Sequence, residues 1–172
     1  MLIGNREFDT KNGVYVMGIL NVTPDSFSDG GLWTERDAAL RQAGRMAEEG
    51  AAIIDIGGES TRPGHTPVSA EDEAARVLPI VEAVKRETGL PVSIDTYKAE
   101  VARAALEAGA DMVNDIWGLR RDGGEMAALI AGTGAACCLM HNRARAEYAD
   151  FMADMLSDLC ETLAIADRAG IA

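Results

Sequence analysis

Five short apolar runs divide the chain, and a polar or ionisable residue follows each of them. The runs cover residues 14–20, 52–56, 92–94, 112–113 and 137–140. Such near-continuous runs are typical of parallel strands that are buried on both faces. The residues that follow the runs are Asn21, Gly57–Gly58–Glu59, Asp95, Asn114–Asp115 and His141–Asn142. We therefore expect five parallel strands with polar side chains at their carboxyl ends.

Helical patterns fill the intervals between these strands. They cover residues 34–49, 69–88, 98–108, 125–131 and 147–169, and a glycine follows each of them. Thr34 with Asp37, and Ser69 with Asp72, have the spacing of a capping box at a helix start. Residues 2–16 ahead of the first strand suggest a hairpin that turns at residues 11–13.

Alternating strands and helices predict an α/β fold with right-handed crossovers and a parallel sheet. The sheet is either open and doubly wound or part of a (β/α)8 barrel. Polar residues at every strand end favour the barrel, whose catalytic groups come from several strands at one mouth. The length of 172 residues argues the other way, since a complete barrel usually takes about 250. Residues 1–172 are expected to form a single domain.

Composition excludes several classes of function. A formal net charge of −12 and a pI near 4.5 make nucleic acid a poor partner. No apolar run approaches the roughly 20 residues of a membrane helix. The N-terminal residues lack the apolar core of a signal peptide, so we expect a cytoplasmic protein. The three cysteines contain no CxxC pair and are expected to be reduced, structural thiols.

The segment after the first strand, residues 23–31, is rich in turn formers but carries Phe27 in its middle. A large aromatic residue has no core to serve on a solvated loop, and long loops in compact domains are usually functional. The alternative is an ordinary surface turn, for which Pro, Asp, Ser and Gly are the usual residues.

The segment after the second strand suggests an anion site. Gly57 and Gly58 would let the backbone approach a ligand, and Thr61 and Arg62 add a hydroxyl and a guanidinium. Arginine binds phosphate and carboxylate oxygens in a bidentate way. The alternative is a surface ion pair between Arg62 and a nearby acid.

Three further polar residues complete the ring of strand ends. Asp95, Asn114 and Asp115 combine carboxylate acceptors with an amide, a set that can read the edge of a heterocycle carrying amide and amino groups. Each one alone could equally cap a turn. Asn21 has the same ambiguity, although its oxygen is the kind of ligand that Mg²⁺ accepts beside a diphosphate.

Two long segments resemble the signature sequences of the dihydropteroate synthase family. They are residues 17–31, MGILNVTPDSFSDGG, and residues 55–64, DIGGESTRPG. Residues 93–98, 113–116 and 139–141 resemble the next three strand ends of the family. The resemblance spans nearly the whole chain and implies a TIM-type barrel.

The resemblance also implies roles for individual residues. Asp95 and Asn114 would bind the pterin ring between the apolar walls Ile116 and Met140. Thr61 and Arg62 would lie beside the diphosphate and 4-aminobenzoate, and Asn21 beside Mg²⁺. Phe27 and Pro63 would surround the aminobenzoate ring, with Asp29 holding the first loop closed. The catalytic residues would be Asp95, Asn114 and Arg62.

The implied reaction condenses 6-hydroxymethyl-7,8-dihydropterin diphosphate with 4-aminobenzoate in folate biosynthesis and releases diphosphate. Mg²⁺ is the implied cofactor, sulfonamides the implied competitors, and the complete enzyme is expected to be a homodimer.

The family continues beyond a segment like residues 169–172 into three further strand–helix units. We therefore expect an incomplete barrel from a truncated sequence, with unpaired first and fifth strands. The alternatives are an inactive fragment that at most binds pterin, and the pterin domain of a methyltetrahydrofolate-dependent methyltransferase.

Overall fold

A computed structural model describes residues 1–22, 31–60 and 67–171 of the chain. Its strands are β1 (Leu2–Ile3), β2 (Arg6–Glu7), β3 (Val16–Asn21), β4 (Ala51–Gly57), β5 (Val92–Asp95), β6 (Met112–Asp115) and β7 (Ala136–Leu139). Its helices are α1 (Gly31–Glu48), α2 (Ala70–Thr88), α3 (Ala99–Glu107), α4 (Glu125–Thr133) and α5 (Phe151–Ala169). All five strands expected from the apolar runs are present.

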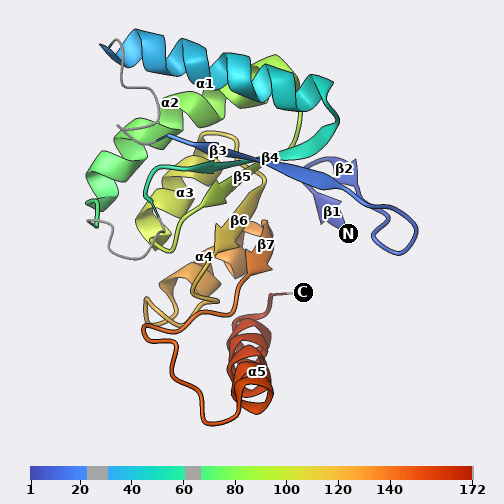
Figure 1. Cartoon of the computed structure of the whole chain (residues 1–172), viewed down its shortest axis with the longest axis vertical. Helices are drawn as coiled ribbons and strands as arrows, with labels where there is room; N and C mark the ends of the chain where they lie inside the picture. Colours follow the sequence, from blue (N-terminus) through green and yellow to red (C-terminus); the bar gives the residue numbers. More distant parts are fainter. Residues whose placement is uncertain (23–30, 61–66, 172) are drawn as a thin grey trace.

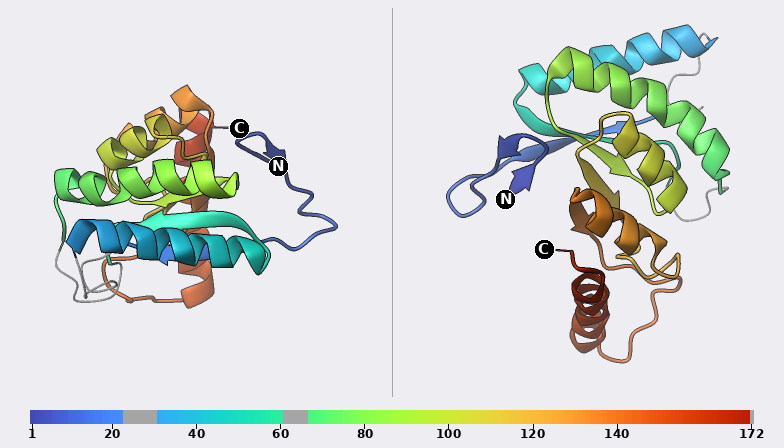
Figure 2. Two further views of the ribbon diagram at one scale, coloured as in Figure 1. Left: turned by 90° about the horizontal axis from the view of Figure 1, so that it is seen from above. Right: turned by 180° about the vertical axis from the view of Figure 1, so that it is seen from behind.

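The main sheet has the strand order β3-β4-β5-β6-β7, with every neighbouring pair parallel. The helices form an arc outside a curved sheet (Figures 1 and 2). A doubly wound sheet reverses its strand order and carries helices on both faces, whereas a barrel keeps its strands sequential and its helices outside. The arrangement is therefore that of part of a barrel. Among the described residues, β3 and β7 each have one neighbouring strand.

The main core fills the space between the outer face of the sheet and the helices. Alternate strand residues such as Leu20, Ile56 and Ile94 are at most 2% exposed and pack against helix residues including Val77 and Val81. This alternation sends the intervening side chains to the inner face of the curved sheet. The apolar side chains of the outer face thus stabilise the fold, and the inner face is available for polar side chains.

Both expected ends of α2 and the expected end of α5 are correct, whereas the starts of α1 and α5 and the end of α4 differ from the expectation. Ser69 Oγ accepts the backbone N–H of Asp72 at 3.1 Å, and Gly89 ends α2 with φ 65°. The expected capping box at Thr34 is wrong, because α1 already begins at Gly31. The last helix begins at Phe151 and not at residue 147, because the Asp150 side chain caps it by accepting the N–H of Ala153.

The N-terminal hairpin turns earlier than expected. Strands β1 and β2 pair Leu2 with Glu7, so the connection is at residues 4–5 and not at 11–13. The later segment does form a turn, but Asp9 organises it by accepting the backbone N–H groups of Lys11 and Asn12. The hairpin closes one end of the sheet, where Ile3 and Phe8 pack against Ile53 and Met112. In the described part of the chain, no helix is long and apolar enough to span a membrane.

Candidate functional site

Three predicted site residues lie in one row across the carboxyl ends of the strands. In the strand register, Asn21 pairs with Gly57, Gly57 with Asp95, and Asp95 with Asn114. Paired positions on neighbouring strands point to the same face of a sheet. The residues that precede them belong to the outer core: Leu20, Ile56, Ile94 and Val113. Asn21, Asp95 and Asn114 therefore share the inner face at one level.

Glycine leaves the middle of this row open. A Cβ atom at Gly57 would lie 3.4 Å from Asp95 Oδ2 and 3.7 Å from Asn21 Oδ1, so both oxygens lie close over the backbone of β4. Gly58 has a different role from the one expected. A side chain at this position would project toward α2, where a Cβ would approach Val77 Cγ1 to 2.7 Å. Gly57 keeps the site open, whereas Gly58 allows a helix to pack.

Asp95 is the acid of the row, and its surroundings perturb its pKa strongly. Its Oδ1 atom is buried and has no hydrogen-bond partner within the described ranges. Burial, together with the negative charges of Asp55, Glu73 and Asp115, raises the pKa of Asp95 to about 7. A carboxyl group in such surroundings gains from a ligand that brings hydrogen-bond donors or positive charge.

Asn114 is held by a second buried acid. Its Nδ2 atom donates to Asp55 Oδ2 at 3.0 Å, and Asp55 is 3% exposed. Asp55 lies on the same face as Gly57, two residues deeper on β4. Burial raises the pKa of Asp55, although the hydrogen bond from Asn114 opposes this effect. The inner face therefore carries a buried acid, Asp55, below the row.

Asp115 does not join the polar ring, contrary to the expectation. Its carboxylate accepts the backbone N–H groups of Trp117 and Leu119, each at 2.8 Å. These bonds stabilise the turn after β6, where Leu119 has a φ of 65°. Asp115 is on the outer face and 2% exposed, so the capping alternative is correct for this residue.

The two expected apolar walls follow directly after β6 and β7. Ile116 is half-buried, and Met140 is 44% exposed. The backbone N–H of Met140 donates to the carbonyl oxygen of Asp115 at 3.0 Å. Beyond Met140, Arg143 binds Asp158 of α5 in a bidentate way at 2.6 and 3.1 Å. The backbone around Met140 is thus attached both to β6 and to α5.

Five further predicted site residues lie outside the described residues. They are Phe27, Asp29, Thr61, Arg62 and Pro63. Their assigned roles remain predictions from the sequence.

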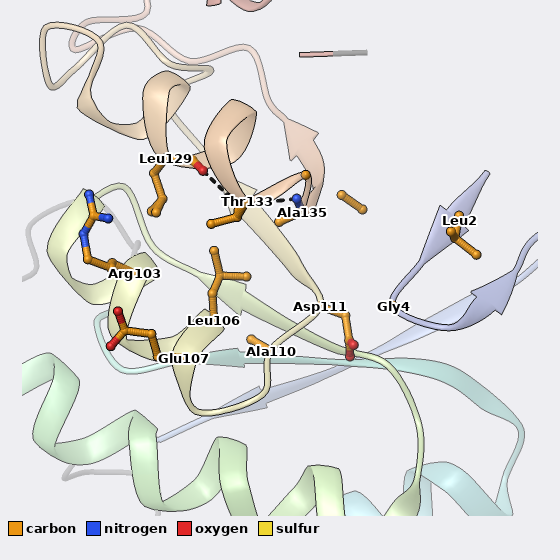
Figure 3. Close-up of a pocket in the computed structure, with 12 residues that line it drawn as sticks. Leu2, Gly4, Arg103, Leu106, Glu107, Ala110, Asp111, Leu129, Thr133 and Ala135 are labelled. Carbon is orange, nitrogen blue, oxygen red and sulfur yellow. Dashed lines mark hydrogen bonds between the residues drawn. The ribbon is translucent and has the colours of Figure 1, made fainter. Parts of the chain in front are cut away.

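Two cavities in the described part of the chain contain none of the predicted site residues. One, of about 520 Å³, lies at the opposite end of the sheet, where Leu2, Leu106 and Asp111 are among its lining residues (Figure 3). The other, of about 450 Å³, lies between α4 and α5. The inner face is instead openly accessible, since Ile19 beside the row is 62% exposed. Across residues 1–22, 31–60 and 67–171, no group of three or more His, Cys, Asp or Glu side chains is placed to hold a metal ion.

The sequence profile described as "Pterin binding enzyme" matches residues 17–172, which is most of the chain. The chain belongs to the pterin-binding enzyme family. A dihydropteroate synthase of Clostridium beijerinckii is 53% identical over 171 residues, covering 99% of this chain and 63% of the relative. The expected resemblance to dihydropteroate synthases is confirmed.

Solved structures agree with this assignment. A dihydropteroate synthase of Clostridium difficile, described as in the presence of pteroic acid, has a TM-score of 0.92 and 47% identity, covering 96% of this chain and 63% of the other. That of Xanthomonas albilineans, described with 4-aminobenzoic acid, has a TM-score of 0.87 and 48% identity, covering 94% and 59%. The chain spans about three fifths of the length of these relatives. The predicted α/β fold, an incomplete parallel barrel of five strand–helix units, is confirmed.

In this member of the pterin-binding enzyme family, a buried ion cluster lies beside the row. Lys98 Nζ lies 2.5 Å from both Glu59 Oε2 and Glu73 Oε2, and it also donates to the carbonyl oxygen of Val68 at 2.7 Å. Tyr97 donates its hydroxyl to Glu59 Oε1 at 3.0 Å. The cluster therefore joins the end of β4, the start of α2 and the start of α3.

Reasoning from the sequence missed Asp55 and the members of this cluster. For Asp55 a signal existed, since a carboxylate interrupts an otherwise apolar strand run. For Glu73 there was none, because an acidic residue in the first turn of a helix is ordinarily solvated and favoured by the helix dipole. For Lys98, the N-cap residue of α3, the local pattern identified no buried partner. Their burial follows from the packing of α2 against α3.

Proposed function

We propose that this chain carries the pterin-binding part of a dihydropteroate synthase, a transferase that joins 6-hydroxymethyl-7,8-dihydropterin diphosphate to 4-aminobenzoate. The observation that supports the proposal best is the convergence of Asn21, Asp95 and Asn114 on the inner face, in a fold matching synthases described with pteroic acid or 4-aminobenzoic acid. Methyl transfer has no comparable support.

The proposed reaction is a substitution at the methylene carbon of the pterin. The carbon–oxygen bond to the diphosphate breaks first, and the diphosphate leaves with the bonding electrons. The amine nitrogen of 4-aminobenzoate then bonds to the methylene carbon and loses a proton. In this scheme Asp95 stabilises the positive charge that develops on the pterin, and Asn114 orients the ring.

The remaining parts of the proposal rest on the family resemblance. Thr61 and Arg62 bind the diphosphate side, Phe27, Asp29 and Pro63 enclose the aminobenzoate, and Ile116 and Met140 flank the pterin. Asn21 supplies an oxygen donor of the type that suits Mg²⁺, which would neutralise charge on the diphosphate. Cytoplasmic location, a homodimer and competition by sulfonamides belong to the same proposal.

Calorimetric titration followed by turnover on the same sample tests the proposal. We expect saturable binding of the pterin diphosphate and, after addition of 4-aminobenzoate, release of diphosphate with formation of dihydropteroate. Binding without turnover would favour the alternative of an inactive pterin-binding module, which the coverage of about three fifths of the relatives makes worth testing. Absence of binding would contradict the proposed function.

Replacing Asn114 by Ala is expected to weaken binding of the pterin diphosphate at least about tenfold, because one buried hydrogen bond to the ring is lost. The matched control is Asn5→Ala, which makes the same change in the exposed connection of the hairpin at the other end of the sheet. Equal affinities of the two variants, measured by calorimetry, would remove Asn114 from the site.

A further inference from the structure

Asp55 is the one described acid that touches a proposed pterin-binding residue from below. Its Oδ2 atom accepts a hydrogen bond from Asn114 Nδ2 at 3.0 Å across the intervening strand β5. At 3% exposure, Asp55 lies too deep to serve as an open surface acid. Its position makes it a support for Asn114.

The contact determines which end of the Asn114 amide is turned away from Asp55. An ionised carboxylate can only accept hydrogen bonds, whereas an amide has a donating nitrogen and an accepting oxygen. Turning the amide around would place two acceptor oxygens against each other in a buried place, at a substantial cost. Asn114 must therefore give its NH₂ group to Asp55, which leaves its carbonyl oxygen for another partner.

Asp95, the neighbour of Asn114 in the row, also offers a hydrogen-bond acceptor. Asp95 Oδ1 is buried and has no partner among the residues that the structure describes. The row thus presents two acceptors side by side, one from β5 and one from β6. Burial and the charge of Asp55 both raise the pKa of Asp95, since the two carboxyl groups lie on the same face of neighbouring strands.

We propose that Asp55 is a positioning residue that sets the hydrogen-bonding polarity of the site. By holding the amide nitrogen of Asn114, it makes Asn114 and Asp95 a pair of acceptors that selects ring edges carrying N–H donors over edges that lack them. The inference rests on the proposed function, and it adds the basis on which the pterin ring is selected.

Pterin and its deaminated analogue 4-hydroxypteridine are suitable probes because they differ in one group. Pterin carries an amino donor where 4-hydroxypteridine carries a hydrogen atom, and the ring nitrogens are the same in both. With Asn114 held by Asp55, we expect the parent chain to favour pterin by about a hundredfold, since a buried acceptor is left without a donor when the amine is absent. In Asp55→Leu the Asn114 amide is free to turn, and the preference is expected to fall below about tenfold.

Asp55→Asn is the conservative variant that separates position from charge. Its side-chain oxygen can still accept from Asn114, so we expect it to restore at least half of the parent's logarithmic preference for pterin. A purely structural role would change both affinities in parallel and leave their ratio unaltered. An unchanged ratio in Asp55→Leu would overturn the proposal.

A measurement without ligand keeps this inference separate from the proposed function. In ¹⁵N–¹H spectra of the parent, the Asn114 side-chain NH₂ is expected to show slowed exchange with solvent, and Asp55→Leu is expected to lose this protection. Rapid exchange in the parent overturns the positioning contact. Protection in a parent that binds neither probe supports the contact, but contradicts the proposed function.

Discussion

Replacing Lys98 by Met is expected to lower the free energy of unfolding by about 3–5 kcal/mol, the usual result of removing one partner from a buried ion pair. The ammonium group of Lys98 neutralises two carboxylates, Glu59 and Glu73, which are 6% and 1% exposed. Without it, the Glu73 carboxylate remains in a place that water hardly reaches, so it must take up a proton or move. These two acids raise the pKa of Lys98 against the opposing effect of its burial.

Chemical denaturation of the parent and the variant measures this loss, and Lys85→Met is the matched control. Lys85 forms a pair with Asp111 at the same distance of 2.5 Å, but its side chain is 32% exposed, against 14% for Lys98. Asp111 also keeps a hydrogen bond from the backbone N–H of Val92. We expect the control to lose only about 1 kcal/mol, because the Lys85 ammonium is better hydrated and Asp111 keeps a second hydrogen-bond donor.

A second variant separates the loss of charge compensation from the effect of introducing the Met side chain. The double change Lys98→Met with Glu73→Gln removes the buried charge of Glu73 and is expected to recover part of the lost stability. If Lys98→Met and Lys85→Met cost the same, the buried cluster contributes no more than a surface pair, and our account of it is wrong.

The strands and most helices could be predicted because their signals are local. A parallel strand buried on both faces needs a short apolar run, and each run ends where the backbone reaches the mouth of the sheet. The polar residue after the run then falls at the mouth, which is how Asn21, Asp95 and Asn114 were found. Ser69 and Gly89 act within one helical turn, so the ends of α2 were equally readable.

The contacts between distant residues could not be predicted in this way. Asp55 and Asn114 are 59 positions apart, and only the strand order brings them together. Asp115 shows that two residues adjacent in the sequence can also have different roles. It follows Asn114 directly, yet strand alternation sends it to the outer face, where it stabilises a turn. The sequence identifies the residues at a strand end, but the pleat decides which of them meet a ligand.

Replacing Asp95 by Asn is expected to stabilise the chain while it weakens pterin binding. A pKa near 7 lies about three pH units above the ordinary 3.8, so the ionised form is unfavourable in the folded chain. Three pH units correspond to about 4 kcal/mol, which partial exposure of Asp95 reduces to about 2 kcal/mol. For a domain of this size the midpoint temperature should rise by about 5 °C.

The gain in stability of Asp95→Asn over the parent should increase as the pH rises. The unfolded chain releases the Asp95 proton near pH 4, whereas the folded chain keeps it until about pH 7. Between these values the folded state binds more protons, so the parent loses stability as the pH rises. The amide of the Asp95→Asn variant cannot ionise, and the difference between variant and parent should therefore grow from about pH 5.5 to about pH 8.

Thermal unfolding at these two values, with Glu82→Gln as the control, tests this expectation. Glu82 is exposed on α2, and its replacement removes one negative charge without removing a buried one. The control should leave the unfolding temperature nearly unchanged at both pH values. Calorimetry of the same samples should show pterin binding at least about tenfold weaker in Asp95→Asn alone. A variant that is no more stable than its parent at the higher pH would show that the Asp95 charge is well solvated and that burial does not raise the pKa of Asp95.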